Sequence, residues 1–254
     1  MTDTVRATVG ERDGADMLLA TLQIYREAFS RASVLALRNW PVLGSVFAYS
    51  LILSVAVQVA APFGIFGGFL VSLVSSACIG SFLYLVEMIV RTSRVTLPDF
   101  SRSFGAYLWD VVGVTFVLWI AMRLITPVLA QSPQGPVLML CIQLAILVLF
   151  NAVPELIYLG HHSSLALLSE SYRFVADNWI EWFPPNVLLL LIFWYLWNLP
   201  LERSFPVGGV VVAVLHTGLV ALFVYFAMVV RGLLFLELSG STRRGRAFRR
   251  RMGL

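Results

Sequence analysis

Apolar residues run along this chain in six long blocks that polar segments separate. A helix needs about 20 consecutive, largely apolar residues to cross a bilayer. The blocks that we predict to be membrane spans are Val42–Ala61, Gly67–Val90, Leu108–Leu129, Val137–Tyr158, Val187–Leu199 and Val207–Val230. Prolines support these bounds, because they cluster at the predicted ends and only Pro154 lies inside a span. The fifth span is the shortest, and Pro184 and Pro185 mark its start.

A second pattern precedes the first, third and fifth spans. The chain there reads FSRASVLALRNW (29–40), FSRSFGAYLWDV (100–111) and LSESYRFVADNW (168–179). Apolar residues recur every three or four positions and charged residues oppose them, which predicts amphipathic helices. The first and third of these helices are expected to end at Asn39–Trp40 and Asn178–Trp179, before the chain enters a span. Such helices lie in the plane of the membrane surface, with aromatic rings at the boundary between lipid and water. The aromatic residues that we expect there are Phe29, Trp40, Phe100, Tyr172, Trp179 and Trp182.

The three stretches indicate an internal repeat. Aligned without gaps, residues 16–40 and 87–111 share six identities in 25 positions. Any linker that rests on a bilayer must be amphipathic, which explains the apolar stripe but not the shared register. The division that we predict is a polar N-terminal tail (1–14), a six-span membrane domain (15–238) with repeat units 15–91, 92–160 and 161–238, and a basic tail (239–254). The expected fold is therefore all-α and polytopic, with six transmembrane helices as three hairpins, each preceded by an amphipathic interfacial helix.

Composition agrees with a membrane protein and sets its orientation. Hydrophobic residues make up 59% of the chain and charged residues 13%, whereas soluble domains carry about 25% charged residues. Arginines gather before the first span, between the second and third spans, and after the sixth. By the positive-inside rule, both termini are expected in the cytoplasm, with the protein in the bacterial inner membrane. Six arginines in the tail should attract anionic lipid, and nothing in the charge pattern indicates binding to nucleic acid.

Polar residues within or beside the spans are the candidate functional residues, because an ionisable group in a membrane is costly and is often functional. The predicted cluster consists of Glu87, Arg91, Asp110, Asn151, Pro154, Glu155, Arg231 and Glu237. Glu87 and Arg91 have the i,i+4 spacing of a helical ion pair, whereas Arg231 and Glu237 are six apart and should not pair directly. Either these groups hold the helices together, which we favour, or they form a path for protons or cations.

Two local features bear on helix packing. Pro154 cannot donate a hydrogen bond to the carbonyl of Phe150, so that carbonyl is expected to be free. A neighbouring helix should satisfy it, and binding of a cation or water is the alternative. Ser72, Ser76 and Gly80 give the second span a face of small residues, which favours close packing within the chain or with a partner.

Residue patterns typical of enzymes do not occur. The chain has no GxSxG, HExxH, P-loop or GxGxxG sequence, and its two cysteines form no CxxC pair. We therefore expect no catalytic residue, no metal and no cofactor. The favoured function is a non-catalytic membrane scaffold or accessory subunit of an inner-membrane complex, with a membrane-protein partner or a homo-oligomer in the lipid bilayer. The alternative is a small transporter or channel using the acidic residues at the cytoplasmic helix ends, and an enzyme acting on lipid is third.

The segments YREAFSRASVLALRNW (25–40) and SESYRFVADNWIEWF (169–183) also carry a resemblance. The chain resembles a group of bacterial six-span proteins that are similar to YciC-type inner-membrane proteins and to the membrane-anchor domain of glycerophosphodiester phosphodiesterases. The resemblance covers roughly residues 16–238. It implies a membrane domain, and it does not imply hydrolysis, because the soluble phosphodiesterase domain does not occur in this chain.

Overall fold

The computed structural model describes residues 2–160, 164–199 and 209–240. This part of the chain is 88% helical and contains no strand, which confirms the all-α prediction. Six of its helical segments are long and apolar enough to cross a membrane. The predicted start of the sixth span at Val207, and the arginines of the tail, lie outside the described residues.

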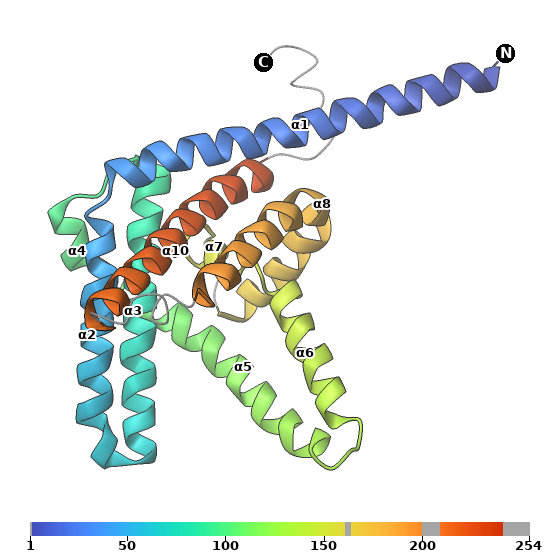
Figure 1. The fold of residues 1–254 in the computed structure, drawn as a ribbon. Helices are drawn as coiled ribbons and strands as arrows, with labels where there is room; N and C mark the ends of the chain where they lie inside the picture. The colour runs from blue at the N-terminus through green and yellow to red at the C-terminus, as the bar shows by residue number, and fades with distance from the viewer. Residues whose placement is uncertain (1, 161–163, 200–208, 241–254) are drawn as a thin grey trace.

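The first helix, α1 (Thr2–Arg38), lies across the top of the bundle in Figure 1. It includes residues 2–14, so the segment that the sequence assigned to a polar tail is the first part of this helix. The chain leaves α1 at Asn39–Trp40, as expected, and enters α2 (Val42–Ala60). We refer to the end of the bundle at which α1 lies as the α1 end.

The first hairpin pairs α2 with α3 (Ile65–Thr92) through a short 3-10 turn, η1 (Ala61–Phe63). The two helices meet at a glycine at the start of α3. A Cβ atom at Gly67 would collide with the backbone carbonyl of Ala60, so only glycine fits this contact. Gly135 meets the carbonyl of Leu129 in the same way at the tip of the second hairpin.

The second hairpin follows a short helix. α4 (Leu97–Ser103) is shorter than predicted, because the chain leaves the helical conformation before α5 (Leu108–Leu129) and Gly105 takes a positive φ of 87°. Asp99 accepts hydrogen bonds from the backbone N–H and the hydroxyl of Thr96 at the start of α4, and these bonds lower the pKa of Asp99.

The fourth span is not one continuous helix. It consists of α6 (Gly135–Leu149) and α7 (Val153–Leu159), and residues 150–152 between them are not helical. Pro154 lies in the first turn of α7, where a proline is tolerated because its missing N–H would have no partner within the helix.

The third hairpin is formed by α8 (Ser164–Trp197) and α10 (Gly209–Ser239). The sequence predicted an amphipathic helix that ends at Asn178–Trp179 and a span that starts at the two prolines. Instead α8 bends at Asn178, whose φ is −122°, and then continues helically through Pro184 and Pro185. The sixth span is longer than predicted, since α10 extends to Ser239.

A side chain from α1 makes these two prolines tolerable. Pro184 and Pro185 cannot donate to the carbonyls four residues earlier, which belong to Ile180 and Glu181. The hydroxyl of Tyr25 lies 2.8 Å from the Glu181 oxygen and 3.5 Å from the Ile180 oxygen. A hydrogen bond from another helix therefore replaces what the proline pair removes from α8.

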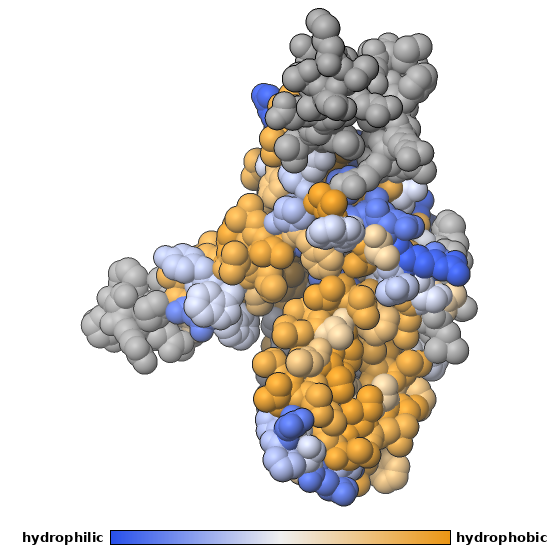
Figure 2. All heavy atoms as spheres, turned by 90° about the vertical axis from the view of Figure 1, so that its right-hand side faces the viewer, coloured by the Kyte–Doolittle hydropathy of each residue, from blue (hydrophilic) through white to orange (hydrophobic). Residues whose placement is uncertain are grey.

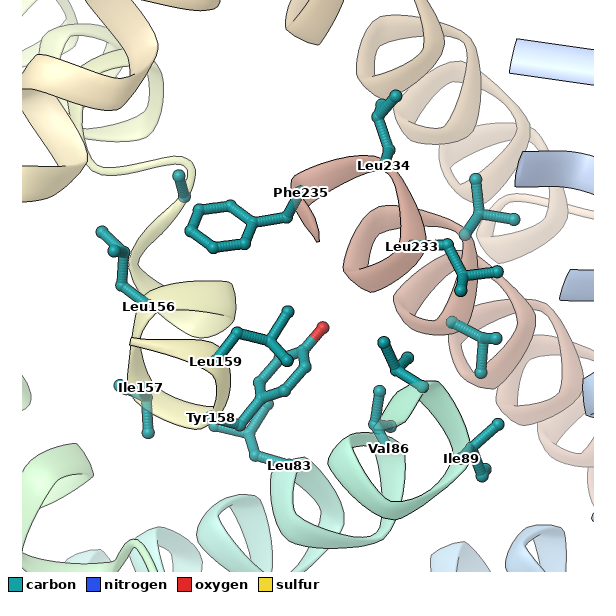
Figure 3. Close-up of a cluster of buried hydrophobic side chains, with 14 of the residues drawn as sticks. Leu83, Val86, Ile89, Leu156, Ile157, Tyr158, Leu159, Leu233, Leu234 and Phe235 are labelled. Atoms are coloured by element: carbon teal, nitrogen blue, oxygen red, sulfur yellow. The ribbon is translucent and has the colours of Figure 1, made fainter. Parts of the chain in front are cut away.

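The core lies between α3, α7 and α10 at the α1 end. Figure 3 shows Tyr158 of α7 between side chains of α3 and α10, with its hydroxyl directed toward α10. The most apolar parts of α3 and α10 are 39% and 44% buried, but those of α5 and of the α6–α7 span are only 11% buried. Figure 2 shows the resulting apolar surface over the α5–α6 hairpin, which stands away from the α2–α3 hairpin in Figure 1.

The predicted interfacial aromatic residues divide into two groups. Trp40, Tyr172 and Trp179 are exposed by 67%, 54% and 59%, while Phe29 and Phe100 are half-buried. Trp182 is fully buried, so its assignment to the membrane interface was wrong. Trp182 lies one turn after Trp179 on the same helix, and the packing of α8 against α10 turns it inward.

The glycine at the tip of the first hairpin generates a prediction with a control beside it. Gly67→Ala should destabilise the folded protein by about 1–3 kcal/mol, because the added methyl group forces α2 and α3 apart. Gly68→Ala meets no atom within 4 Å and should leave stability unchanged or slightly raised. Thermal unfolding of both variants in detergent measures the difference, and equal midpoints would contradict the close approach at Gly67.

Candidate functional site

A buried cluster surrounds Arg231 of α10, whose side chain is only 16% exposed. Its guanidinium forms a two-bond ion pair with Glu155 of α7, whose side chain is fully buried. The Nε–Oε1 distance is 2.6 Å and the Nη2–Oε2 distance is 2.8 Å. Two-bond pairs between a guanidinium and a carboxylate are among the strong hydrogen-bonded ion pairs in proteins.

Two asparagines receive the remaining donors of Arg231. Asn151 accepts one bond at its backbone oxygen (2.6 Å) and one at Oδ1 (3.3 Å), and Asn186 accepts one at Oδ1 (2.9 Å). A guanidinium has five N–H donors, and the five bonds use one each. A buried charge is stable only when it is paired and hydrogen-bonded, and this arrangement meets both conditions.

Trp182 of α8 closes the cluster. Its indole N–H donates to Oδ1 of Asn151 at 2.9 Å, and its ring lies 5.3 Å from the guanidinium carbon of Arg231, within the range of a cation–π contact. Asn186 donates in turn to the carbonyl of Trp182 at 2.6 Å. The ring also packs edge-on against Phe174. The cluster thus joins α7, both halves of α8, and α10.

The break between α6 and α7 is what makes Asn151 available. The sequence predicted a free carbonyl at Phe150, but that oxygen accepts the backbone N–H of Val153 at 3.2 Å, so the prediction was wrong at this residue. The carbonyl that a neighbouring helix satisfies is that of Asn151, through Arg231. Interruption of a span is tolerated when other helices satisfy the released backbone groups.

Close packing brings α10 against α7. A Cβ atom at Gly232 would lie 2.7 Å from the hydroxyl oxygen of Tyr158 and 2.9 Å from Val90. Glycine after Arg231 therefore lets α10 approach α3 and α7 closely enough for the guanidinium to reach Glu155.

A second ionic group lies nearby on α3. Glu87 and Arg91 form the predicted pair, with Nε 3.0 Å from Oε1. The hydroxyl of Tyr107 donates to Glu87, and Arg91 donates to the carbonyl of Leu159 at the end of α7 at 3.2 Å. Burial and the hydrogen bond to Glu87 raise the pKa of Tyr107 above its ordinary value. This group ties α3 to α7 and to the start of α5.

The remaining predicted residues lie apart from these two groups. Asp110 is half-buried in the first turn of α5, and Glu237 is exposed near the end of α10. On the predicted small-residue face, Ser76 and Gly80 are buried but Ser72 is exposed. A Cβ atom at Gly80 would lie 3.0 Å from the backbone of Tyr107, so this face serves packing within the chain.

Sequence reasoning missed several of the residues that complete these groups. It did not pair Glu155 with Arg231, which are 76 positions apart, and it did not include Asn186 or Tyr158. In the sequence these residues stand out only as polar residues among apolar ones. That pattern identifies candidate residues, but it does not show which of them contact one another. The Arg231 cluster can hold helices in place, but all five guanidinium donors are already used, so none is left to bind a substrate.

The comparisons with known proteins identify no relative. No family model matches the chain, and neither a curated protein nor a solved structure is significantly similar to it. Within the described residues, no three His, Cys, Asp or Glu side chains come together in a way that could hold a metal ion.

The Arg231 cluster predicts an asymmetry between single and double substitutions. Arg231→Met alone should destabilise the protein by about 3–5 kcal/mol, because it leaves the Glu155 carboxylate buried without a cation. Adding Glu155→Leu should recover a large part of that loss, since no isolated charge remains. Unfolding in detergent measures both variants.

Arg173→Met provides the control for the loss of an arginine. The side chain of Arg173 is 71% exposed in its pair with Glu170, so its removal should cost less than about 1 kcal/mol. Glu155→Leu is also measured alone. If the loss of stability in the double variant equalled the sum of the losses in Arg231→Met and Glu155→Leu, then Arg231 and Glu155 would not act as a pair.

Proposed function

We propose that this protein is a non-catalytic membrane scaffold or accessory subunit of a bacterial inner-membrane complex. The observation that carries the proposal is the α5–α6 hairpin, which buries little against the rest of the described chain. Figure 2 shows an apolar surface over this hairpin. Its exposed apolar side chains include Trp119, Leu124, Leu140, Leu144 and Leu147. Spans whose side chains are mostly exposed offer large surfaces to other membrane helices.

A polar side chain on this surface supports a protein partner. Gln143 lies in the middle of α6, is exposed, and makes no hydrogen bond within the described part of the chain. Leu140, Leu144 and Leu147 surround it on the exposed face of the helix. Lipid tails cannot hydrogen-bond an amide, whereas a neighbouring transmembrane helix can. The partner that fits is therefore a transmembrane helix with a hydrogen-bonding group at the depth of Gln143.

The buried charges favour this function over transport. A proton or cation path needs acidic groups that can release one partner and take another. Glu155 is held by two bonds to Arg231, and Glu87 is held by Arg91 and Tyr107. Both carboxylates support the packing of helices, which is the role expected of a scaffold.

The orientation is part of the proposal. Arginines gather in the segments at the α1 end, including Arg38, Arg91, Arg94 and Arg102, whereas the tip between α5 and α6 carries none. The positive-inside rule then assigns the α1 end and both termini to the cytoplasm.

Photo-crosslinking in cells tests the partner surface. A photoreactive amino acid at Leu147 should yield an adduct with a membrane protein, whose mass identifies either a second copy of this chain or another subunit. Gln143→Leu should reduce the adduct roughly fivefold or more, because a hydrogen bond between membrane helices contributes about 1–2 kcal/mol. Gln58→Leu is the matched control, since Gln58 is exposed on α2 but hydrogen-bonds Ser54 of its own helix.

Two results would contradict the proposal that this surface binds a membrane partner. One is a monomer without any adduct at Leu147, and the other is an adduct that Gln143→Leu and Gln58→Leu reduce equally.

Reconstitution into liposomes tests the transport alternative. Because both carboxylates are engaged, wild-type protein should carry no proton or alkali-cation flux above that of protein-free liposomes. A pH-sensitive or cation-sensitive dye inside the vesicles reports this flux. A flux that Glu155→Gln abolishes, while the unfolding midpoint stays unchanged, would reverse the choice between the two functions.

A further inference from the structure

A pocket of about 460 Å³ opens at the α1 end, at the elbow between α1 and α2. Two segments far apart in sequence form it, and Figure 1 shows the elbow beside α4. The lining residues are Arg38, Asn39, Pro41, Val42, Arg94, Val95 and Phe100.

Asn39 holds the two segments together. Its Nδ2 donates to the carbonyl of Ser93 at 3.2 Å, and its Oδ1 accepts the backbone N–H of Val95 at 2.8 Å. Arg94 lies between these two residues, and Arg38 lies directly before Asn39. A single buried amide therefore fixes two arginines, 56 positions apart, on adjacent backbones of one pocket.

The backbone around the pocket is also fixed. Ser93 has a positive φ of 62°, which turns the chain sharply out of α3. The carbonyl of Asn39 lies 3.3 Å from the hydroxyl of Tyr225, so α10 anchors the elbow from the other side. The pocket is thus preformed, and a ligand need not order the backbone when it binds.

The charge of the pocket is positive. Arg38 and Arg94 are both exposed, and neither forms an ion pair with a described residue. Among the described residues, no carboxylate lines the pocket, and the nearby Asp99 is already engaged by Thr96. Two unpaired guanidinium groups at one pocket favour an anion, and the planar guanidinium matches the oxygen pairs of phosphate.

The position of the pocket identifies the kind of anion. The chain changes there from α1 to the first span, and Trp40, a residue type typical of the membrane surface, is 67% exposed beside it. Val42, Val95 and Phe100 give the pocket an apolar wall next to its two charges. We propose that Arg38 and Arg94 bind the phosphate of an anionic phospholipid, whose acyl chains follow the adjoining span into the bilayer. The proposal does not depend on the scaffold function, and it concerns a different site from the basic tail.

Native mass spectrometry of the full-length protein tests the site. Delipidated protein in neutral detergent is titrated with phosphatidylglycerol and, separately, with phosphatidylcholine. An arginine near anionic lipid contributes about 1 kcal/mol, so Arg38→Gln and Arg94→Gln should each weaken phosphatidylglycerol binding roughly fivefold, and the double variant roughly 25-fold. Phosphatidylcholine should bind more weakly to wild type and should be less affected.

Arg102→Gln is the matched control. Arg102 is exposed on α4, close in sequence to Arg94, but it does not line the pocket. Its removal lowers the net charge equally and should change phosphatidylglycerol binding less than twofold. An equal loss of phosphatidylglycerol binding in Arg102→Gln and Arg94→Gln would mean that the lipid is attracted by positive charge in general, and it would overturn the proposal.

Inorganic phosphate distinguishes a lipid from a soluble anion. Millimolar phosphate should not displace phosphatidylglycerol from wild type, because the apolar wall contributes only to lipid binding. Displacement by phosphate alone, or no loss of lipid in the double variant despite an unchanged unfolding midpoint, would overturn the assignment to a phospholipid.

Discussion

The architecture at the α1 end depends on satisfying one guanidinium in apolar surroundings. Arg231 lies on a helix whose other residues are mostly apolar, and an unpaired charge there would cost several kcal/mol. Its partners come from α7, from the part of α8 that follows the bend at Asn178, and from the break between α6 and α7. Because all of these partners must be present together, this one requirement positions three segments relative to α10.

Backbone carbonyl groups inside the membrane must likewise find hydrogen-bond partners. The fourth span is broken and the fifth contains two prolines, and each defect releases carbonyl groups that lipid cannot satisfy. Arg231 donates a hydrogen bond to the carbonyl of Asn151, and the hydroxyl of Tyr25 in α1 donates one to the carbonyl of Glu181. In α1, Ala32, Leu35 and Ala36 are buried, so this helix is part of the folded core and not only a surface attachment. Packing of α1 therefore helps α8 to continue through its two prolines.

The tight α1 end contrasts with the open α5–α6 hairpin. Buried ion pairs favour one arrangement of helices, because breaking such a pair leaves an uncompensated charge. The start of α5 is tied to α3 through Tyr107 and Glu87, but most of the apolar surface of the α5–α6 hairpin remains exposed. A rigid end that fixes the elbow at Asn39 and an open hairpin available to other helices suit a protein that holds partners in a bilayer. The Arg38–Arg94 pocket would add a contact with lipid at the level of the head groups.

The sequence by itself determined the helical class, the six spans and two of the changes in direction. Length and apolarity decide whether a helix can cross a bilayer, and those are local properties. Amphipathic helices were predicted to end at Asn39–Trp40 and at Asn178–Trp179; the chain leaves α1 at the first pair, and α8 bends at Asn178 but continues. The Glu87–Arg91 pair was predictable too, since an i,i+4 spacing on one helix fixes the distance.

Only the tertiary structure decided which polar groups meet. Trp179 and Trp182 share a helical face in sequence, yet one is exposed and the other is fully buried, because α10 covers only part of that face. No local rule pairs Glu155 with Arg231, sends Tyr25 to the carbonyls before Pro184 and Pro185, or places Arg38 beside Arg94. These contacts join residues 56 to 156 positions apart, and their geometry exists only after the helices have packed.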